Sequence, residues 1–387
     1  MSNLKEQFLL SPDVIYLNHG SFGATPRPVF ETYQTWQRQL ENQPVQFIDK
    51  ELPVQLANAR QRLGNYLNVD SKDLVYVPNA TFALNIVARS LKLAPGDEVL
   101  TTNIEYGACN NVWQFLSQKR GFLYLQQKMP FPFQSDQTVI DQLWQGVTAN
   151  TKVIFISHIT SSTAVTFPVE AICQRAKEEG ILTIVDGAHA PGQIELDLEK
   201  IGADFYFGNA HKWMCSPKGS AFLYTRQERQ NLLEPLVVGW GWGENRVFTF
   251  GSDYLDYFQW LGTNDVSAYL SVPAAIEFQT QNNWPGIRQQ CHALLKNILA
   301  RINQLTGLPS PYPDDLYYHQ MAVAQLPPIT DLKAFKSQLY EDFRIEVPCT
   351  QWEDKQFIRV SIQAYNTEAD GDALINALKS LLPTYCA

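Results

Sequence analysis

Short apolar runs alternate with longer amphipathic stretches along much of the chain. Residues 74–77 are all apolar, and apolar residues then recur at Leu84, Val87 and Leu91, which is the spacing of one face of a helix. This order of strand, polar loop and helix is repeated several times. The expected strands cover residues 74–77, 98–101, 122–125, 152–157, 181–185 and 205–207, and the expected helices cover residues 26–40, 52–67, 82–91, 108–119, 139–146 and 169–179.

Strands that alternate with helices predict right-handed crossovers and a mostly parallel sheet of the α/β class. In such a sheet, ligands bind beyond the carboxyl ends of the strands. Polar residues follow the expected strands at the points where they would meet at this edge. They are Asn79 and Thr81, Tyr106, residues 158–160, residues 186–189, and His211 with Lys212.

The pattern changes after about Tyr224. Glycine and tryptophan alternate in residues 238–243, a combination used in pockets and interfaces, or in a loop packed on its own core. The remainder reads as a smaller α+β domain. Its expected helices cover residues 266–281, 287–305, 331–340 and 368–382, and its expected strands cover residues 319–325, 345–347 and 357–362.

The chain length and the net charge limit the possible domain organisation and function. Single cores rarely grow beyond about 250 to 300 residues, so the 387 residues predict more than one domain. We expect an N-terminal segment (1–20), a large domain (21–265) and a small domain (266–387). The net charge of -9 leaves no surplus of Lys and Arg to neutralise phosphates, which argues against nucleic-acid binding.

Cysteine usage and the N-terminal residues indicate the compartment. The six cysteines are scattered without metal-type spacing, as in a reduced, cytosolic protein. The N-terminal residues carry Lys5 and Glu6 and lack the apolar core of a secretory signal or a membrane span. We therefore expect a cytoplasmic protein that does not contact a membrane.

An acid and an amine stand at the ends of two expected strands. Asp186 follows a β-branched run, and Lys212 follows the run at 205–207. This pair suits pyridoxal phosphate chemistry, in which a lysine forms a Schiff base with the cofactor aldehyde and a carboxylate keeps the pyridine nitrogen protonated. Taken alone, each residue has a structural explanation, such as a helix cap, an ion pair or a surface lysine. Asn79 and Thr81, at a strand-to-helix turn, add the local chemistry of a phosphate cradle.

Other cofactors match the sequence less well. His158, His189 and His211 fall at neighbouring strand ends, but no short spacing of metal ligands supports a zinc site, so we expect no metal. The sequence contains no glycine-rich phosphate-binding loop and no glycine-rich dinucleotide-binding fingerprint. Nucleotide-dependent enzymes are therefore disfavoured.

From residue 15 to residue 382 the chain resembles the class V aminotransferases of the fold type I pyridoxal phosphate superfamily. It is most similar to the isopenicillin N epimerase branch, with cysteine desulfurases and cystine C-S lyases as more distant relatives. The resemblance rests on Asp186 with His189, on His211 with Lys212, and on the segment around Arg359. It implies a large domain with a mostly parallel seven-stranded sheet flanked by helices, plus a smaller α+β C-terminal domain.

The resemblance also implies roles for cofactor-binding residues. Lys212 would carry the Schiff base, Asp186 would pair with the pyridine nitrogen, and His189 would reach the phenolic oxygen. The phosphate would be held by Asn79, Ala80, Thr81 and His211, with Tyr106 over the ring and Thr160 near its edge. In a homodimer, Thr263 and Asn264 would reach the phosphate of the neighbouring subunit.

Substrate residues follow from the same resemblance. Arg359 would grip the α-carboxylate of an amino acid, and Asn18, His19 and Gly20 would line the substrate side. In desulfurases a nucleophilic cysteine precedes the substrate arginine on a mobile loop. Here Cys349 is the candidate at that position, but its surroundings read as a strand end.

We therefore expect a pyridoxal phosphate enzyme that acts at Cα of an amino acid, with Lys212 as the base. Reprotonation from the opposite face would make it an epimerase, which is the favoured reaction, with Tyr106 or His19 as the second donor. Elimination would make it a C-S lyase or desulfurase, and transfer of the amino group an aminotransferase. A cofactor-binding scaffold without activity is the non-enzyme alternative.

Overall fold

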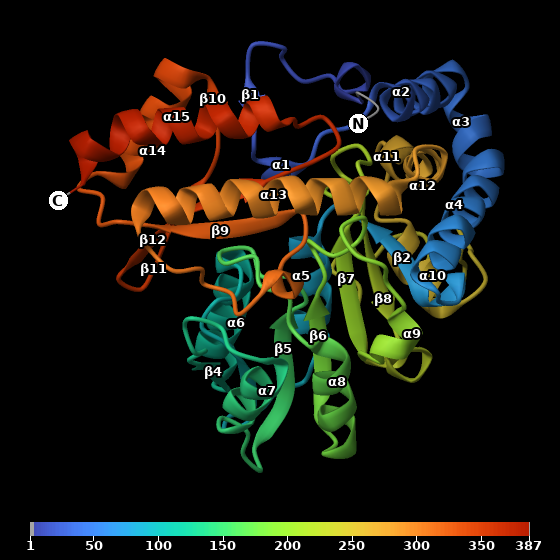
Figure 1. The fold of residues 1–387 in the computed structure, drawn as a ribbon. Coiled ribbons are helices and arrows are strands. Elements are labelled where there is room, and N and C mark those ends of the chain that lie inside the picture. The colour runs from blue at the N-terminus through green and yellow to red at the C-terminus, as the bar shows by residue number, and fades with distance from the viewer. Residues whose placement is uncertain (1–3, 387) are drawn as a thin grey trace.

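A seven-stranded sheet forms the centre of the computed structural model, which describes residues 4–386 (Figure 1). Its strand order is β2-β8-β7-β6-β5-β3-β4, and only β8 runs antiparallel to its neighbours. This confirms the expected mostly parallel α/β sheet. The strands are β2 Leu74–Val77, β3 Glu98–Thr102, β4 Leu123–Gln127, β5 Thr151–Ser157, β6 Leu182–Asp186, β7 Phe205–Asn209 and β8 Ala221–Thr225.

Helices cover both faces of this sheet. Along the central strands, alternate residues enter two separate cores: Phe155 and Ile184 lie in one, Ile154 and Val185 in the other. Strands buried on both faces are expected to be continuously apolar, as these are. The helices of this part are α1 His19–Phe22, α2 Arg27–Asn42, α3 Pro44–Gln46, the π-helix η2 Phe47–Glu51, α4 Leu52–Leu67, α5 Ala80–Ser90, α6 Gly107–Arg120, α7 Asp136–Trp144, α8 Val169–Glu178, α9 Leu198–Ile201 and α10 Asp253–Gln259.

The C-terminal part has its own antiparallel sheet, in the order β11-β12-β9. The long helix α13 crosses the molecule beside β9 (Figure 1). The N-terminal strand β1 (Ile15–Tyr16) pairs in parallel with β10 (Ile345–Glu346). The other elements are α11 Ser267–Leu270, α12 Val272–Gln281, α13 Trp284–Thr306, β9 Met321–Leu326, α14 Leu332–Phe343, β11 Cys349–Trp352, β12 Lys355–Ser361 and α15 Glu368–Tyr385.

Several elements differ from the expectation. The helix expected at 266–281 is divided into α11 and α12 at Ser271, just before Pro273, which lacks an N–H donor. The residues after β1, expected only to line the substrate side, form a helical turn, α1. Strands β8 and β11 and helix α10 were not anticipated. Helix α10 is aromatic-rich, and its N-cap Ser252 accepts the Leu255 N–H.

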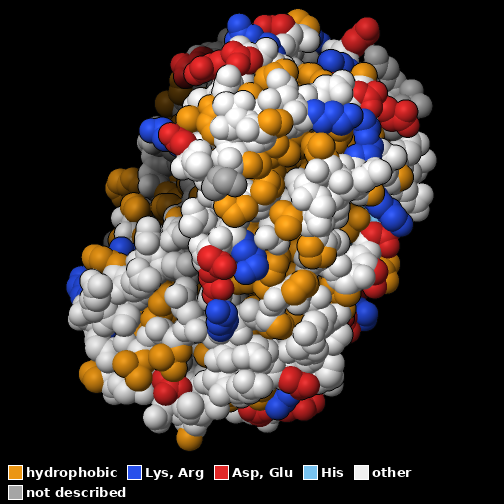
Figure 2. All heavy atoms as spheres, turned by 60° about the vertical axis from the view of Figure 1, so that its left-hand side comes forward, with side chains coloured by type: hydrophobic (Ala, Val, Ile, Leu, Met, Phe, Trp, Pro, Cys, Tyr) orange, Lys and Arg blue, Asp and Glu red, His pale blue; other side chains and the backbone are white. Residues whose placement is uncertain are grey.

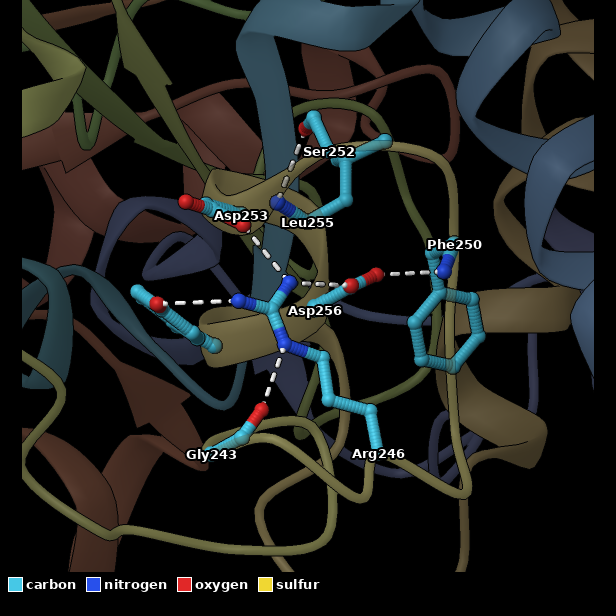
Figure 3. Close-up of polar contacts among 8 residues, drawn as sticks. Gly243, Arg246, Phe250, Ser252, Asp253, Leu255 and Asp256 are labelled. Atoms are coloured by element: carbon cyan, nitrogen blue, oxygen red, sulfur yellow. Dashed lines mark hydrogen bonds and ion pairs between the residues drawn. The ribbon is translucent and has the colours of Figure 1, made fainter.

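The glycine- and tryptophan-rich loop at residues 238–243 is exposed rather than packed on its own core. Trp240 and Trp242 are 63% and 58% exposed, although both are large and apolar. The loop is tied to α10 by Arg246, whose guanidinium lies 2.6 Å from a carboxylate oxygen of Asp253 and 3.0 Å from one of Asp256 (Figure 3). The ion pairs thus hold one end of a loop that presents two indole rings to the outside.

Charged side chains are dispersed over the face of the molecule shown in Figure 2. Figure 2 shows acidic and basic side chains in small groups among hydrophobic and neutral ones on one face of the molecule. Among residues 4–386, no helix is long and apolar enough to cross a membrane.

Candidate active site

Loops from the carboxyl ends of several strands enclose a cavity of about 140 Å³. Most of these loops follow strands of the central sheet that the sequence pattern predicted, so the sheet brings distant polar residues to one edge. The helical turn α1 adds Ser21 and Phe22. The lining residues are Ser21, Phe22, Asn79, Ala80, Thr81, Tyr106, Cys109, Ser157, Ile159, Ser161, Asp186, Ala188, His189, Asn209, His211 and Lys212.

Asp186 and Lys212 both line this cavity. Asp186 ends β6, and its carboxylate accepts the Ala188 N–H at 2.8 Å and faces the Cys109 thiol at 3.5 Å. Burial raises the pKa of the Asp186 carboxyl. Lys212 lies in the turn after β7, and burial lowers the pKa of its amine to about 8. A buried amine with this pKa is partly neutral near pH 7 and is therefore a competent nucleophile and base.

His189 lies between Lys212 and Trp213. Its Nε2 is 3.2 Å from the Lys212 Nζ, and its Nδ1 accepts the Trp213 indole N–H at 3.3 Å. Burial and the nearby Lys212 keep the pKa of His189 well below its usual value. His189 is therefore a neutral imidazole in direct contact with the lysine.

The amino end of α5 forms one side of the cavity. The Asn79 side chain caps this helix by accepting the Phe82 N–H at 2.9 Å, and Asn209 accepts the Ala80 N–H at 2.9 Å. Thr81, the second residue of this helix, also lines the cavity. A helix N-terminus with such donors favours an anion.

His211 lies beside this end of the cavity. Its Nδ1 is 3.0 Å from the Ser220 carbonyl oxygen, which requires a proton on Nδ1 because the oxygen only accepts. Burial and the neighbouring Lys212 lower the pKa of His211 to about 4. The ring is thus neutral and holds a fixed orientation.

Arg359 reaches the cavity wall from β12. Its guanidinium donates to the Ser161 carbonyl oxygen at 2.5 Å and to the Ser21 hydroxyl at 3.0 Å, and both serines line the cavity. The buried Nε of Arg359 has no hydrogen-bond partner within residues 4–386. Burial lowers the pKa of Arg359 to about 10, so the guanidinium is still charged near neutral pH. An arginine with an unused donor in this position suits a carboxylate.

Several of the remaining expected residues lie behind the cavity rather than in its lining. Thr160 is fully buried and bonds Thr163 at 2.8 Å. The His19 ring bonds the Tyr365 hydroxyl at 2.9 Å and the Lys212 carbonyl oxygen at 3.1 Å. Asn18 and Gly20 also do not line the cavity; the helical turn α1 turns Ser21 and Phe22 toward it instead.

The residue that follows α1, Gly23, nevertheless lies directly against the lysine-bearing loop. Gly23 has φ +69°, and a Cβ at this position would lie 2.0 Å from the His211 carbonyl oxygen. Only glycine permits this close approach.

Tyr106 lines the cavity at its rim and is 48% exposed.

Thr263 and Asn264 lie in an exposed loop outside this cavity. Asn264 donates to the Gly262 carbonyl oxygen at 2.6 Å. Neither residue contributes to the site of its own chain. Their expected role in a neighbouring subunit stays a prediction.

Sequence reasoning missed several residues that line or support the site. They are Ser21, Phe22, Cys109, Ser157, Ser161, Asn209 and Trp213. Cys109 occurs at the start of an expected helix directly after a site loop, which is a position that could have been flagged. Its thiol has a pKa raised well above the usual value, mainly by burial, so it is not a thiolate.

The donor set fits pyridoxal phosphate. It offers a buried amine for the aldehyde, a carboxylate for the pyridine nitrogen, a helix N-terminus for the phosphate and a neutral imidazole beside the lysine. The fold and the site together are those of the fold type I pyridoxal phosphate enzymes. The family model described as aminotransferase class-V matches residues 15–374, and the chain belongs to this family.

Similar proteins confirm the expected resemblance. An isopenicillin N epimerase from Amycolatopsis lactamdurans is 35% identical over 391 residues, covering 98% of both chains. A probable chloroplastic L-cysteine desulfhydrase from Arabidopsis thaliana is 27% identical, covering 96% of this chain and 83% of that protein. The solved structure of a mutant of the cystine C-S lyase C-DES, with glycine covalently linked to its PLP cofactor, has a TM-score of 0.82 at 23% identity and covers 97% of this chain and 98% of its own.

Proposed function

We propose that this chain is a pyridoxal phosphate-dependent epimerase that acts at Cα of an amino acid. The observation that carries the proposal is the placement of the Lys212 amine, the Asp186 carboxylate and the Arg359 guanidinium around one cavity region. The preference for epimerisation is supported by the similarity to isopenicillin N epimerase over 98% of both chains.

Each residue has a defined task in this proposal. The cofactor, when bound, supplies an electron sink for the negative charge that develops at Cα. Arg359 holds the substrate carboxylate, which decides which bond at Cα can be broken. Lys212, whose pKa is lowered to about 8 by burial, removes the Cα proton as a neutral amine. Asp186 keeps the proton on the pyridine nitrogen.

An epimerase also needs a proton donor on the face of Cα opposite the base. We assign this task to Tyr106, which lines the cavity and is partly open to solvent. His19 is the weaker candidate because both of its ring nitrogens are engaged, by Tyr365 and by the Lys212 carbonyl oxygen.

A C-S lyase is the second candidate. It is supported by the similarity to the probable L-cysteine desulfhydrase. The variant of this chemistry that needs a nucleophilic cysteine has less support. Cys349 lies in β11 and pairs with Ile358 of β12. Burial raises the pKa of its thiol to about 12, so it is not a thiolate at neutral pH.

We further propose that the active unit is a homodimer in which Thr263 and Asn264 reach the cofactor phosphate of the partner. The exposed indole rings of Trp240 and Trp242 lie in the loop before α10, and Thr263 and Asn264 lie in the loop after it. Large apolar side chains on an anchored loop are typical of an interface.

The cofactor is tested by the visible absorption band of the purified protein. Lys212→Ala is expected to abolish the band of the covalently held cofactor, whereas Lys119→Ala, on the exposed face of α6, leaves it unchanged. A wild-type protein that does not acquire this band when pyridoxal phosphate is supplied contradicts the proposal.

The reaction is tested by incubation with amino acids in deuterated water. Deuterium at Cα together with loss of optical purity supports the epimerase. Release of pyruvate and sulfide supports the lyase, and formation of the pyridoxamine form of the cofactor supports the aminotransferase. Tyr106→Phe is expected to slow epimerisation more than exchange of the Cα proton, because exchange needs only one face.

A further inference from the structure

The indole N–H of Trp213 is directed at the candidate base system. Its Nε1 is 3.3 Å from the Nδ1 of His189, and the opposite nitrogen, Nε2, is 3.2 Å from the Lys212 Nζ. Both the Trp213 and the His189 side chains are buried. The imidazole therefore connects the indole to the amine through its two ring nitrogens.

The donor chemistry of these contacts determines where the His189 proton lies. An indole N–H can only donate, so the Nδ1 that receives it must be unprotonated. The imidazole is neutral because burial opposes its charged form. Its single proton is therefore on Nε2, the nitrogen that faces Lys212.

Neighbouring residues hold both the indole ring and the backbone of Trp213. The His19 ring lies against it with a centroid distance of 4.9 Å, and a Cβ on Gly20 would lie 3.4 Å from Trp213 Cζ2. The Trp213 carbonyl oxygen accepts the Gln279 side-chain N–H at 3.4 Å. Gln193 in turn donates to the His189 carbonyl oxygen at 2.8 Å, which holds the other partner.

We propose that Trp213 is a positioning residue that locks His189 in the Nε2–H tautomer, so that an N–H donor faces Lys212 and the phenolic oxygen of the bound cofactor. Before the cofactor arrives, this donor faces the lone pair of the Lys212 amine once that amine is neutral, which is above its pKa of about 8. Once Lys212 is joined to the cofactor, the same N–H becomes available to the phenolic oxygen. The second step rests on the proposed function, whereas the tautomer does not.

The tautomer is measured in cofactor-free protein by nitrogen NMR of histidine labelled with ¹⁵N. Only six histidines are present, and His189→Ala identifies the signal of His189. In the expected tautomer, the protonated nitrogen couples to both ring protons and the unprotonated nitrogen to only one. The spectrum is recorded at about pH 9, where the Lys212 amine is mostly neutral. A wild-type His189 that carries its proton on Nδ1, or on both nitrogens, at this pH overturns the proposal.

Trp213→Phe removes the indole donor and keeps an aromatic ring. The expected result is a mixture of both neutral tautomers, with the two His189 nitrogen signals shifted toward each other. Trp113→Phe is the matched control, because Trp113 is equally buried and its indole N–H has no hydrogen-bond partner within residues 4–386. An unchanged His189 spectrum in Trp213→Phe refutes the role of Trp213.

A second measurement uses the wild-type side chain and decides the matter if Trp213→Phe does not fold. The Trp213 indole proton in tryptophan-labelled protein is expected to shift upfield when His189→Ala removes its acceptor. An indole signal that does not respond overturns the inference. Since neither measurement needs cofactor or substrate, failure of the proposed function leaves both results interpretable.

Discussion

Arg359→Lys is the substitution that most directly tests the substrate geometry. Arg359 directs its guanidinium at Ser161 and Ser21, and its buried Nε has no partner within residues 4–386. Lysine keeps the positive charge but cannot form two parallel bonds to a carboxylate. Loss of one charge-assisted hydrogen bond costs about 1.5–3 kcal/mol. The Kd of an amino acid should therefore rise about 10- to 150-fold.

The assay follows the absorbance change of the bound cofactor as an amino acid is added. The same titration with the corresponding amine, which lacks the carboxylate, completes a double-mutant cycle. Wild-type protein should prefer the amino acid, and Arg359→Lys should lose most of this preference while it retains the cofactor band. Arg62→Lys is the control, since Arg62 forms a half-exposed ion pair with Glu277. An unchanged ratio of amino-acid to amine affinity in Arg359→Lys would refute the assignment.

Three further predictions follow from burial. The pKa of Lys212 is lowered to about 8, and only the neutral amine attacks an aldehyde. Borohydride trapping of pyridoxal phosphate by cofactor-free protein should therefore increase with pH and level off above about pH 8. A plateau reached only above about pH 10 would contradict this. Cys349→Ala should retain activity, because the thiol pKa of about 12 prevents thiolate formation; complete loss of turnover in folded protein would instead favour a desulfurase. Phe155→Ala, in the centre of the sheet, should lower the free energy of unfolding by about 3–5 kcal/mol in a denaturant titration, whereas Phe22→Ala, 70% exposed, should change it by less than about 0.5 kcal/mol.

The sequence pattern predicted most of the seven-stranded sheet because its strands, apart from the edge strand β4, are largely buried on both faces. Such strands are short and continuously apolar, and the helices between them have one apolar face. Strand β8 was missed because it runs antiparallel between β2 and β7 and so breaks the repeating order. Strand β11 was missed because its residues are only partly buried or exposed and give no apolar run.

The candidate site divides in the same way. Asp186, Lys212 and Asn79 could be found because each stands directly after an apolar strand, and the edge of a parallel sheet collects such residues. The positions expected to line the substrate side were displaced by a single helical turn, which brings Ser21 and Phe22 to the cavity in place of His19 and Gly20.

The sequence by itself therefore determined the class of fold, the family and the pair of residues that suits the cofactor, since these depend on local order along the chain. Only the tertiary structure decided how those residues are held. Arg359 meets Ser21 across 338 positions, and the His189 ring receives its proton donor from Trp213 on another loop. A hydrogen bond is sensitive to differences of a few tenths of an ångström in the donor–acceptor distance and to the direction of the donor. Those quantities are set by packing and cannot be read from spacing.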